Sequence, residues 1–329
     1  MRANLRPYDH AADFEQVGQF LVRTYRSSGG HINWVQPRWE YMHYHPLIRG
    51  VDLRTIGIWE APRGIVGLVH PEHEMGTAYF EIDPDHGDLE RAMLTHAEQH
   101  LSVSHDGMRR LRIYLNEQDD DFQAIAATMG YEPTDERDPM SRFVIPTPFP
   151  RILLPRGYRL RSLAEDNDLR KVDRVLWRGF GHGDSPPEDG IADREFMQSA
   201  PNFRKDLTVV VEAPDGAFVS FCGMWYEPIH AIAYVEPVAT DPDYRAMGLG
   251  RAAVLEGIRR CGALGASEAW VGSTMPFYLS FGFRPAYQSR VWRRAWTRGG
   301  EPGARGSPAE ARGDEPGRRG DEGEARSSA

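Results

Sequence analysis

The two halves of this chain of 329 residues resemble each other at four points, and this internal repeat constrains the fold more than any other feature. Each half opens on a short Leu-Arg segment, at Leu5 and at Leu160, followed by apolar residues at helical spacing. Three later matches keep the same order: 59–62 with 211–214, 82–86 with 240–244, and 129–133 with 281–285. One match alone could be chance, but four in one order indicate a duplication. We therefore expect two similar domains, residues 1–148 and 156–297.

A proline-rich segment separates the two halves. Ile145-Pro146-Thr147-Pro148-Phe149-Pro150 is typical of an extended and fairly stiff linker, which we place at residues 149–155. After about Trp296 the chain has almost no large apolar side chain, so burial cannot offset the entropy of ordering it. Residues 298–329 are therefore expected to form a disordered tail.

A strand, a turn and a helix start follow one another after residue 231. Residues 231–240 are apolar and β-branched, Asp241-Pro242-Asp243 is typical of a turn, and apolar residues return at helical spacing after Gly250. Gly248 and Gly250 therefore lie where a helix begins. Unpaired backbone N–H groups and the positive end of the helix dipole favour an anion such as a pyrophosphate there. Arg245 and Arg251 add positive charge.

Three classes of protein place glycines at such a turn. A Walker A loop would end in Gly-Lys-Ser/Thr, which this stretch lacks. Residues 248–253 fit the dinucleotide fingerprint formally, and Glu268 lies at about the right distance for a ribose-binding acid. However, a polar turn separates the strand from the first glycine, and Glu268 precedes an apolar run instead of ending a strand. The fit to the dinucleotide fingerprint is therefore poor. A dinucleotide-binding oxidoreductase is kept only as a rival hypothesis.

The third class fits best. The pattern Arg245-x-x-Gly248-x-Gly250, followed by Pro276-Phe277-Tyr278-Leu279-Ser280-Phe281-Gly282-Phe283-Arg284-Pro285, resembles the GNAT family of N-acetyltransferases, and the repeat resembles its tandem form. The resemblance implies an α/β fold of two GNAT-like domains, each with a mixed, partly splayed β-sheet flanked by helices. It also implies acetyl-CoA as co-substrate, with the pyrophosphate on the loop and the pantetheine arm along the preceding strand. The residues so implied in cofactor binding are Val238, Ala239, Thr240, Arg245, Ala246, Met247, Gly248, Leu249, Gly250 and Arg251.

Two residues are candidates for the chemistry. Tyr278 matches the family's tyrosine and would donate a proton to the CoA sulfur; the alternative is an aromatic packed in the core. Glu236 lies on the strand before the loop and is either a general base or an acid that orients the substrate. Pro237 cannot donate to a sheet and predicts a bulge or a splayed edge beside it. The family often has an asparagine where this chain has Ser273 and Thr274, so that contact is missing.

The first copy departs from the pattern and is expected to be degenerate. After Ile82-Asp83-Pro84-Asp85-His86 there is no second glycine and no leading arginine, and Asp85, Asp88 and Glu90 would face the phosphates. Repulsion between like charges in a partly buried site opposes the binding of CoA. The position that corresponds to Tyr278 is Ala126.

Composition restricts the function further. The net charge of −9 gives no generally basic surface for nucleic acid, and it weakly favours a cationic amine substrate. Only Cys222 and Cys261 occur, which suggests a reducing compartment and no cysteine-based metal site. The histidines at 31, 43 and 45 lack a third ligand with diagnostic spacing, so we expect packed side chains and no metal. Neither a signal core nor an apolar run of about eighteen residues is present, so we expect a cytoplasmic protein with no membrane partner.

These observations predict an acetyl-CoA-dependent N-acetyltransferase that acts directly on a primary amine of a small molecule or peptide. A non-catalytic, acyl-CoA-binding regulatory protein is the alternative. A polyamine, an aminoglycoside-like compound, an amino acid and a protein lysine all fit the acidic charge without being ranked. Whether the first copy narrows the acceptor cleft, forms a homodimer or stabilises the second copy stays open.

Overall fold

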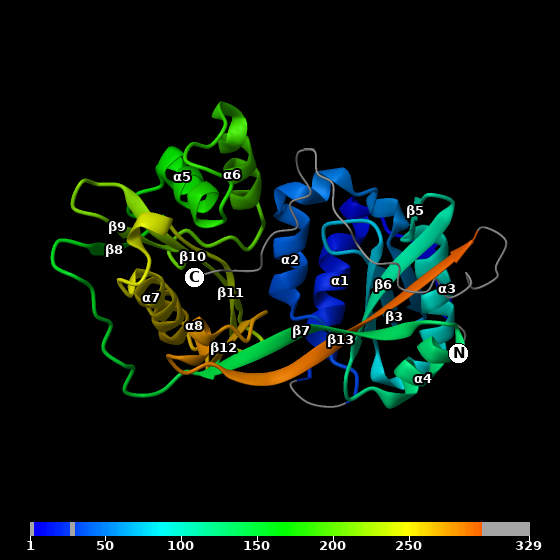
Figure 1. Ribbon diagram of the computed structural model, residues 1–329. Coiled ribbons are helices and arrows are strands. Elements are labelled where there is room, and N and C mark those ends of the chain that lie inside the picture. Colours follow the sequence, from blue (N-terminus) through cyan, green and yellow to red (C-terminus); the bar gives the residue numbers. More distant parts are fainter. Residues whose placement is uncertain (1–2, 27–29, 298–329) are drawn as a thin grey trace.

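A computed structural model describes residues 3–26 and 30–297 of the chain. The predicted tail, residues 298–329, lies outside the described part. We call the elements from β1 to β7 the N-terminal copy and those from β8 to β13 the C-terminal copy (Figure 1).

The N-terminal copy alternates strands and helices in the order expected of an α/β unit. Its helix α1 covers the segment in which apolar residues recur at helical spacing, and Asp9 caps it by accepting a hydrogen bond from the Ala12 N–H. The helices are α1 (His10–Thr24), α2 (Gln36–Tyr44), α3 (Glu90–His100) and α4 (Asp120–Thr128), with short 3₁₀ turns at Pro46–Gly50, Leu53–Thr55 and Pro84–Leu89. The strands are β1 (Asn4–Pro7), β2 (Gly57–Ala61), β3 (Gly64–His70), β4 (Thr77–Ile82), β5 (Val103–His105), β6 (Met108–Asn116) and β7 (Glu132–Val144).

The C-terminal copy repeats this order. The strand and the helix predicted around the glycines are confirmed as β11 (Ile232–Thr240) and α7 (Leu249–Ala263). The other helices are α5 (Leu169–Gly179), α6 (Ile191–Gln198) and α8 (Pro276–Leu279), with 3₁₀ turns at Glu188–Gly190 and Pro242–Tyr244. The other strands are β8 (Arg159–Ser162), β9 (Val209–Glu212), β10 (Phe218–Glu227), β12 (Glu268–Val271) and β13 (Arg284–Thr297). Residues 149–155, the predicted linker, contain neither helix nor strand.

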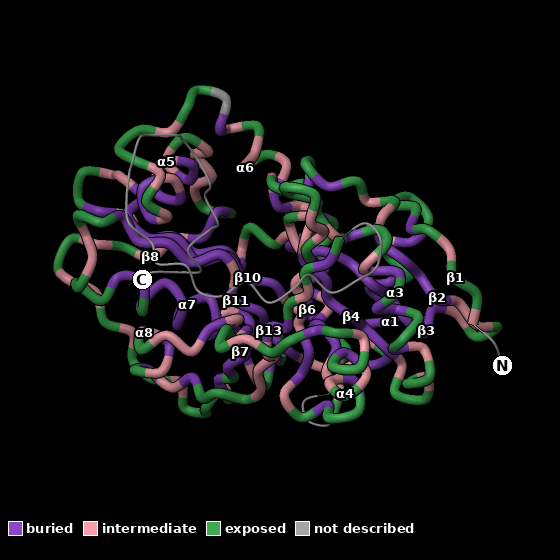
Figure 2. Tube along the Cα trace, turned by 45° about the vertical axis from the view of Figure 1, so that its right-hand side comes forward, coloured by how far each residue is buried: buried purple, intermediate pink, exposed green. Residues whose placement is uncertain are grey.

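Helices cover both faces of the sheet in each copy. In the C-terminal copy, Val209 and Val211 pack with the α7 side of the core, whereas Val210 packs with the α5 side. This alternation is the period-2 pattern of a strand buried on both faces. In the N-terminal copy, α1 and α2 cover one face while α3 and α4 cover the other. Figure 2 shows the strands as the buried centre of both copies.

The two copies exchange their last strands. In the described residues the sheet has 13 strands, in the order β1-β2-β3-β4-β6-β13-β7-β12-β11-β10-β9-β8, with β5 beside β6. β13 of the C-terminal copy pairs antiparallel with β6 of the N-terminal copy, and β7 of the N-terminal copy pairs with β12 of the C-terminal copy. β7 and β13 also pair with each other, so they cross at the centre of the molecule (Figure 1). One continuous sheet therefore joins the copies.

An apolar core also lies between the copies. Val35 and Tyr41 of the N-terminal copy pack with Trp225, Tyr234 and Trp270 of the C-terminal copy. Polar contacts surround this core: the Glu40 carboxylate accepts hydrogen bonds from the Asn202 backbone N–H at 2.6 Å and from its side-chain amide at 2.7 Å. The mixed α/β architecture predicted from the sequence is confirmed.

Candidate functional site

The strands β11 and β12 separate near the middle of the C-terminal copy. They pair in parallel only from Ile232 to Tyr234 of β11, although β11 continues to Thr240. Beyond this point β11 bulges, because Cys222 of β10 faces Val238 while Met224 faces Val235. The predicted irregularity at Pro237 is thus confirmed.

Gly223 makes this bulge possible. A Cβ atom at residue 223 would lie 2.3 Å from the Glu236 carbonyl oxygen and 2.7 Å from the Pro237 ring. Contacts so short do not occur, so only glycine fits opposite the bulge. The bulged backbone is held on its other side by the Trp225 indole N–H, which donates to the Glu236 carbonyl at 2.9 Å.

The open edge of β11 presents backbone groups toward β12. The Asp241 N–H donates to Val219 of β10, so by alternation Ala239 also faces β10, whereas Val238 and Thr240 face the open edge. Of the three residues expected beside a pantetheine arm, two therefore direct their N–H and C=O groups into the gap. Ala239 instead packs closely on α5, where a Cβ at Gly179 would lie 2.7 Å from its methyl group.

A rigid turn leads from β11 into α7. Asp241 accepts a hydrogen bond from the Asp243 N–H, and the guanidinium groups of Arg178 and Arg174 lie 2.8 and 3.1 Å from its carboxylate. Burial acts to raise the pKa of Asp241, but the hydrogen bond from Arg178 and the nearby positive charges outweigh it, and the pKa is lowered. Asp241 therefore stays ionised and keeps its contacts with the two arginines.

The predicted phosphate loop follows this turn. Ala246 and Gly248 have φ angles of +61° and +76°, and α7 begins at Leu249 with no side chain capping its N-terminus. The first N–H groups of a helix have no partner within the helix, and the dipole favours negative charge there. Gly250 is needed for packing, because a Cβ there would lie 2.9 Å from the Thr240 hydroxyl. The loop thus has the geometry of an anion-binding helix start.

The two arginines of the loop have different surroundings. Arg245 points inward and donates to the Gly179 carbonyl at 2.9 Å and to the Thr240 carbonyl at 3.4 Å. It therefore fastens the loop to β11 and α5. Arg251 is exposed on the first turn of α7, with its guanidinium carbon 5.9 Å from the centre of the Phe281 ring. Of the two arginines, Arg251 is the one on the solvent side of this helix start.

A cavity of about 420 Å³ lies between the two copies and joins both candidate residues for the chemistry. The C-terminal copy contributes the bulge of β11, the residues after β12, and α8. The N-terminal copy contributes α2, the segment after β3, and the strands β4, β6 and β7. The charged, aromatic and hydroxyl side chains in its lining include Arg38, Tyr41, Glu72, Glu74, Tyr79, Arg112, Tyr114, Glu136, Arg137, Tyr234, Glu236, Ser273 and Tyr278.

Tyr278 and Glu236 lie on the wall of this cavity. Tyr278 is 1% exposed and packs edge-on against Phe283, with ring centres 5.5 Å apart, so it is at once a core aromatic and a cavity residue. The Glu236 carboxylate accepts a hydrogen bond of 2.5 Å from the Tyr234 hydroxyl. Burial and then the Glu236 charge raise the pKa of Tyr234, which therefore stays a proton donor in this hydrogen bond.

The neighbouring hydroxyls and the rival acid take other positions. Ser273 lines the cavity, but its hydroxyl accepts a hydrogen bond from the Met275 N–H, whereas Thr274 lies at a separate, shallow pocket. Glu268 begins β12 and bonds to the Tyr25 hydroxyl at 3.0 Å and to the Trp270 indole at 3.1 Å. It therefore joins the two copies and does not stand where a ribose-binding acid would end a strand.

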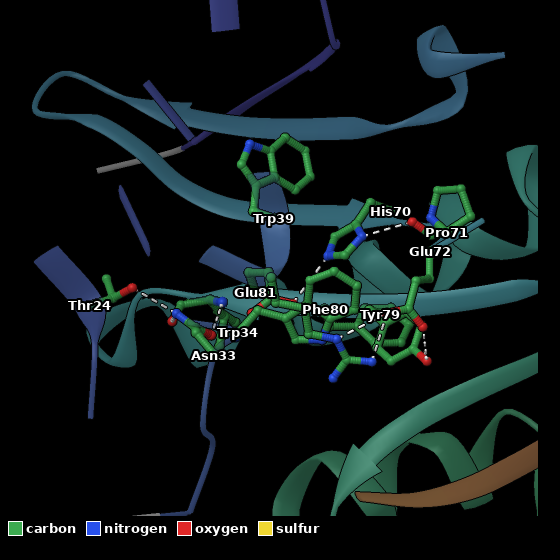
Figure 3. A network of polar contacts seen from close by, with 12 residues as sticks. Thr24, Asn33, Trp34, Trp39, His70, Pro71, Glu72, Tyr79, Phe80 and Glu81 are labelled. Atoms are coloured by element: carbon green, nitrogen blue, oxygen red, sulfur yellow. Dashed lines mark hydrogen bonds and ion pairs between the residues drawn. The ribbon is translucent and has the colours of Figure 1, made fainter. Parts of the chain in front are cut away.

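The corresponding gap in the N-terminal copy is filled by its own chain. β4 and β6 pair only at Thr77 and Ala78 and then separate. His31 spans the gap, with Nε2 3.0 Å from the Phe80 carbonyl oxygen and Nδ1 3.1 Å from the Asp119 carboxylate. Asn33 accepts from the Ile82 N–H at 2.8 Å and donates to the Ile82 carbonyl at 3.0 Å. Its amide also donates to the Thr24 hydroxyl at 2.8 Å (Figure 3).

The repeat identifies what these side chains replace. Residues 82–86 match 240–244, so Phe80 and Ile82 correspond to Val238 and Thr240. The Phe80 carbonyl and the N–H and carbonyl of Ile82 are therefore hydrogen-bonded to His31 and Asn33 in the N-terminal copy. At the equivalent edge of the C-terminal copy, the Thr240 carbonyl accepts a long bond of 3.4 Å from Arg245. Burial acts to lower the pKa of His31, but Asp119 and other acceptors outweigh it and raise the pKa. The imidazolium form donates from both nitrogens, as this bridge requires.

The N-terminal counterpart of the phosphate loop is acidic. Asp85 and Asp88 are exposed on the 3₁₀ turn, and Glu90 is buried at the start of α3. Burial, followed by the charge of Asp119, raises the pKa of Glu90 to about 7. Carboxylates thus occupy the place where an anion would bind in the C-terminal copy.

Sequence reasoning missed the side chains that the N-terminal copy contributes to the cavity, such as Arg38, Glu72 and Tyr114. No motif marks them, because strand exchange and the packing of α2 bring them to the site from distant parts of the chain.

The histidines behave as packed side chains: the centres of the His43 and Trp39 rings are 3.9 Å apart, and burial lowers the pKa of His43 to about 3. Among residues 3–26 and 30–297, no group of three or more metal-binding side chains is placed to hold an ion. Within the same residues, none of the helices combines the length and the apolar character needed to cross a membrane.

Comparisons with known proteins find similarity to acetyltransferases, both in sequence and in fold. The sequence model of the acetyltransferase (GNAT) family matches residues 169–283, from the start of α5 to Phe283, just before β13. A mycothiol acetyltransferase from Saccharomonospora viridis is 27% identical over 205 residues, which are 58% of this chain and 59% of that protein. The match thus spans less than two thirds of the relative's length.

Two solved structures share the fold over most of the chain. A GCN5-related N-acetyltransferase from Sphaerobacter thermophilus superimposes with a TM-score of 0.60 at 16% identity, covering 89% of this chain and 96% of that one. A tandem GNAT protein from the clavulanic acid biosynthesis pathway has a TM-score of 0.59 at 16% identity, with 92% and 100% covered. At this identity the likeness establishes the tandem fold.

Proposed function

We propose that this chain, whose residues 169–283 match the acetyltransferase (GNAT) family model and whose fold is that of a tandem GNAT protein, transfers the acetyl group of acetyl-CoA directly to a primary amine. The observation that supports this most is the continuity of the site in the C-terminal copy. Val238 lines the cavity beside Glu236 and Tyr278, and from there the open edge of β11 leads through the turn to the uncapped start of α7. In the described part of the N-terminal copy, His31 and Asn33 fill the equivalent gap and carboxylates occupy the equivalent turn.

In this proposal the backbone of the C-terminal copy binds the co-substrate. The N–H groups of residues 248–251, with Arg251 beside them, hold the pyrophosphate. Val238 and Thr240 pair with the pantetheine arm as a further strand would. Acetyl-CoA supplies the acyl group as a thioester, and Val238 ends this track at the cavity wall.

Two side chains then move protons. Glu236, directly or through a water molecule, accepts a proton from the ammonium group of the acceptor, which frees the nitrogen lone pair. The nitrogen bonds to the carbonyl carbon as the carbon–sulfur bond breaks, and the electron pair of that bond stays on sulfur. Tyr278 donates its proton to this sulfur, so that CoA leaves as a neutral thiol. The second proton that the nitrogen loses as it becomes an amide returns the Tyr278 phenolate to its neutral form through water, and Glu236 releases its proton to solvent. The hydrogen bond from Tyr234 holds the Glu236 carboxylate in place between turnovers.

Calorimetric titration with acetyl-CoA tests the binding half of this proposal. Arg251→Glu reverses a charge at the exposed start of α7, and we expect roughly tenfold weaker binding. The matched control is Arg91→Glu, an exposed position on the first turn of α3 in the N-terminal copy, which should leave the dissociation constant unchanged. Equal affinity in the wild type and in Arg251→Glu would contradict the proposed phosphate site.

Release of free CoA in the presence of an amine tests the catalytic half. A protein that binds acetyl-CoA but releases no thiol with any amine is the non-catalytic alternative. Amine-dependent release, with the acetylated amine detected by mass spectrometry, supports direct transfer.

A further inference from the structure

Trp225 of β10 packs where the two copies meet and holds the backbone of the bulge in β11. Its side chain is buried, and its indole N–H donates to the Glu236 carbonyl at 2.9 Å. Pro237 follows and has no N–H, so the peptide bond between these two residues offers only this carbonyl to a hydrogen-bonding partner. The indole therefore holds the backbone from which the Glu236 side chain projects.

A second hydrogen bond holds the other end of the same residue. The Tyr234 hydroxyl donates to the Glu236 carboxylate at 2.5 Å. Trp225 and Tyr234 are directly opposite each other in the register of β10 and β11, so their side chains lie on the same face of the sheet. From this one face, an indole fixes the backbone of Glu236 and a phenol fixes its carboxylate.

Helix α2 of the N-terminal copy supports Trp225 in two ways. Tyr41 packs edge-on against the Trp225 ring, with ring centres 6.1 Å apart. The neighbouring Glu40 is buried and accepts hydrogen bonds from the backbone N–H and the side-chain amide of Asn202. The residue after Asn202 is Phe203, which also packs edge-on against Trp225, with ring centres 5.9 Å apart. The position of the Trp225 ring thus depends on the N-terminal copy both directly and through Phe203.

The position of a general base matters for the rate because proton transfer requires hydrogen-bond reach, either direct or through one water molecule. A misplacement of about 1 Å costs on the order of 100-fold in rate. Trp225 does not line the cavity, whereas Glu236 does. Trp225 can therefore affect the reaction only through the residues that it holds.

We propose that Trp225 is a positioning residue for Glu236, and that the N-terminal copy supports acetyl transfer by holding Trp225 in place. This inference rests on the proposed function. It assigns the degenerate copy a part in the reaction that needs no co-substrate site of its own.

Trp225→Phe tests the positioning role, because it keeps an aromatic ring in the core and removes the indole N–H. CoA release is measured with spermidine, lysine and kanamycin, and the kinetic constants with the amine that the wild type acetylates fastest. We expect kcat about tenfold lower than in the wild type, with KM for acetyl-CoA within about twofold. The matched control is Trp39→Phe, which removes a buried indole N–H bonded at 3.3 Å to the Phe14 carbonyl and should keep wild-type kcat.

A double-variant cycle separates positioning from a general loss of structure. Glu236→Gln removes the base and lowers kcat on its own. If Trp225 acts through Glu236, adding Trp225→Phe to Glu236→Gln should lower the remaining kcat by less than about twofold. A tenfold loss in both backgrounds, or no loss in either, would overturn the inference while leaving acetyl transfer in place.

Glu40→Ala tests the part of the N-terminal copy, because it removes the acceptor of both Asn202 hydrogen bonds. We expect kcat to fall about threefold, again only when Glu236 is present. Phe203→Leu, which removes a ring packed on Trp225, should have the same effect, and it keeps the test intact if Glu40→Ala or Trp225→Phe unfolds. Thermal unfolding of each variant shows which ones are folded.

Unchanged kcat in Glu40→Ala and Phe203→Leu would overturn the role of the N-terminal copy. A wild type that releases CoA with none of the three amines would instead remove the proposed function, and this inference with it.

Discussion

The two copies differ in what occupies the gap beside their fourth strand. In the C-terminal copy, Val238 and Thr240 face an open edge; in the N-terminal copy, the equivalent Phe80 and Ile82 are hydrogen-bonded to His31 and Asn33. The strands separate in both copies, so the fold alone does not make a binding groove. Whether the edge can accept a ligand depends on a short segment after the first helix.

The same comparison extends to the chemistry. Opposite Gly223 the C-terminal copy has the bulge with Glu236 and Pro237, whereas opposite His70 the N-terminal copy has a single residue, Tyr79. His70 instead bonds to the buried Glu81 at 3.1 Å, which in turn accepts from the Trp34 N–H (Figure 3). Because of this shift in register, β11 presents the Glu236 carboxylate to the cavity, whereas β4 presents the Tyr79 phenol.

Of the changes that test this difference between the copies, removing the Tyr278 hydroxyl should have the largest effect, which is on the rate of acetyl transfer. Tyr278→Phe is expected to lower kcat about 100-fold, because proton transfer by a positioned group contributes a factor of this order or more. The affinity for acetyl-CoA should stay unchanged in a calorimetric titration. The control is Tyr131→Phe, which removes the hydroxyl of a buried tyrosine in the N-terminal copy and should keep wild-type turnover. Equal turnover in Tyr278→Phe and wild type would assign Tyr278 to packing alone.

Emptying the filled gap should have the next largest effect, on stability. Asn33→Ala leaves the buried N–H and C=O of Ile82 without these partners, and we expect a loss of about 1–3 kcal/mol in the free energy of unfolding, measured with urea. Asn167→Ala removes a half-buried side-chain pair with Gln198 in the C-terminal copy and should cost less, about 0.5 kcal/mol. The wild type should bind one acetyl-CoA per chain. A second equivalent bound at similar affinity would contradict the assignment of His31 and Asn33 as the filling of this gap.

The acidic turn should give the smallest effect, and it depends on pH. Glu90 has a folded-state pKa of about 7, raised from 4.5 mainly by burial, so its negative charge destabilises the fold increasingly as pH rises from 4.5 through 7. Glu90→Gln should therefore melt roughly 2 °C higher than the wild type at pH 8. At pH 5 the two proteins should melt at the same temperature. Glu15→Gln, which neutralises an exposed acid on α1, should show no such dependence. A difference that is larger at pH 5 than at pH 8 would refute the assigned direction.

Local sequence patterns predicted the elements around the loop but not the cavity. The strand β11, the turn at Asp241 and the helix α7 follow from β-branching, proline and helical spacing, which act over a few residues. The contribution of Tyr114 on β6 and Arg137 on β7 to the cavity depends on β13 lying between these strands, a pairing that joins residues more than 140 positions apart. The inward turn of Arg245 toward Gly179 also depends on how α5 packs, which spacing does not reveal.

The exchange of β7 and β13 determines the order in which this protein can be completed during synthesis. The ribosome makes the N-terminal copy first, but the strand that belongs beside β6 consists of residues 284–297. Until those residues emerge, β6 has an unpaired edge, and such edges attract strands of other chains. The nascent N-terminal copy therefore cannot close its sheet on its own, and both copies finish folding in the same late step. A truncation before residue 284 would leave β6 and β7 with unpaired edges at the same time, because β13 lies between them.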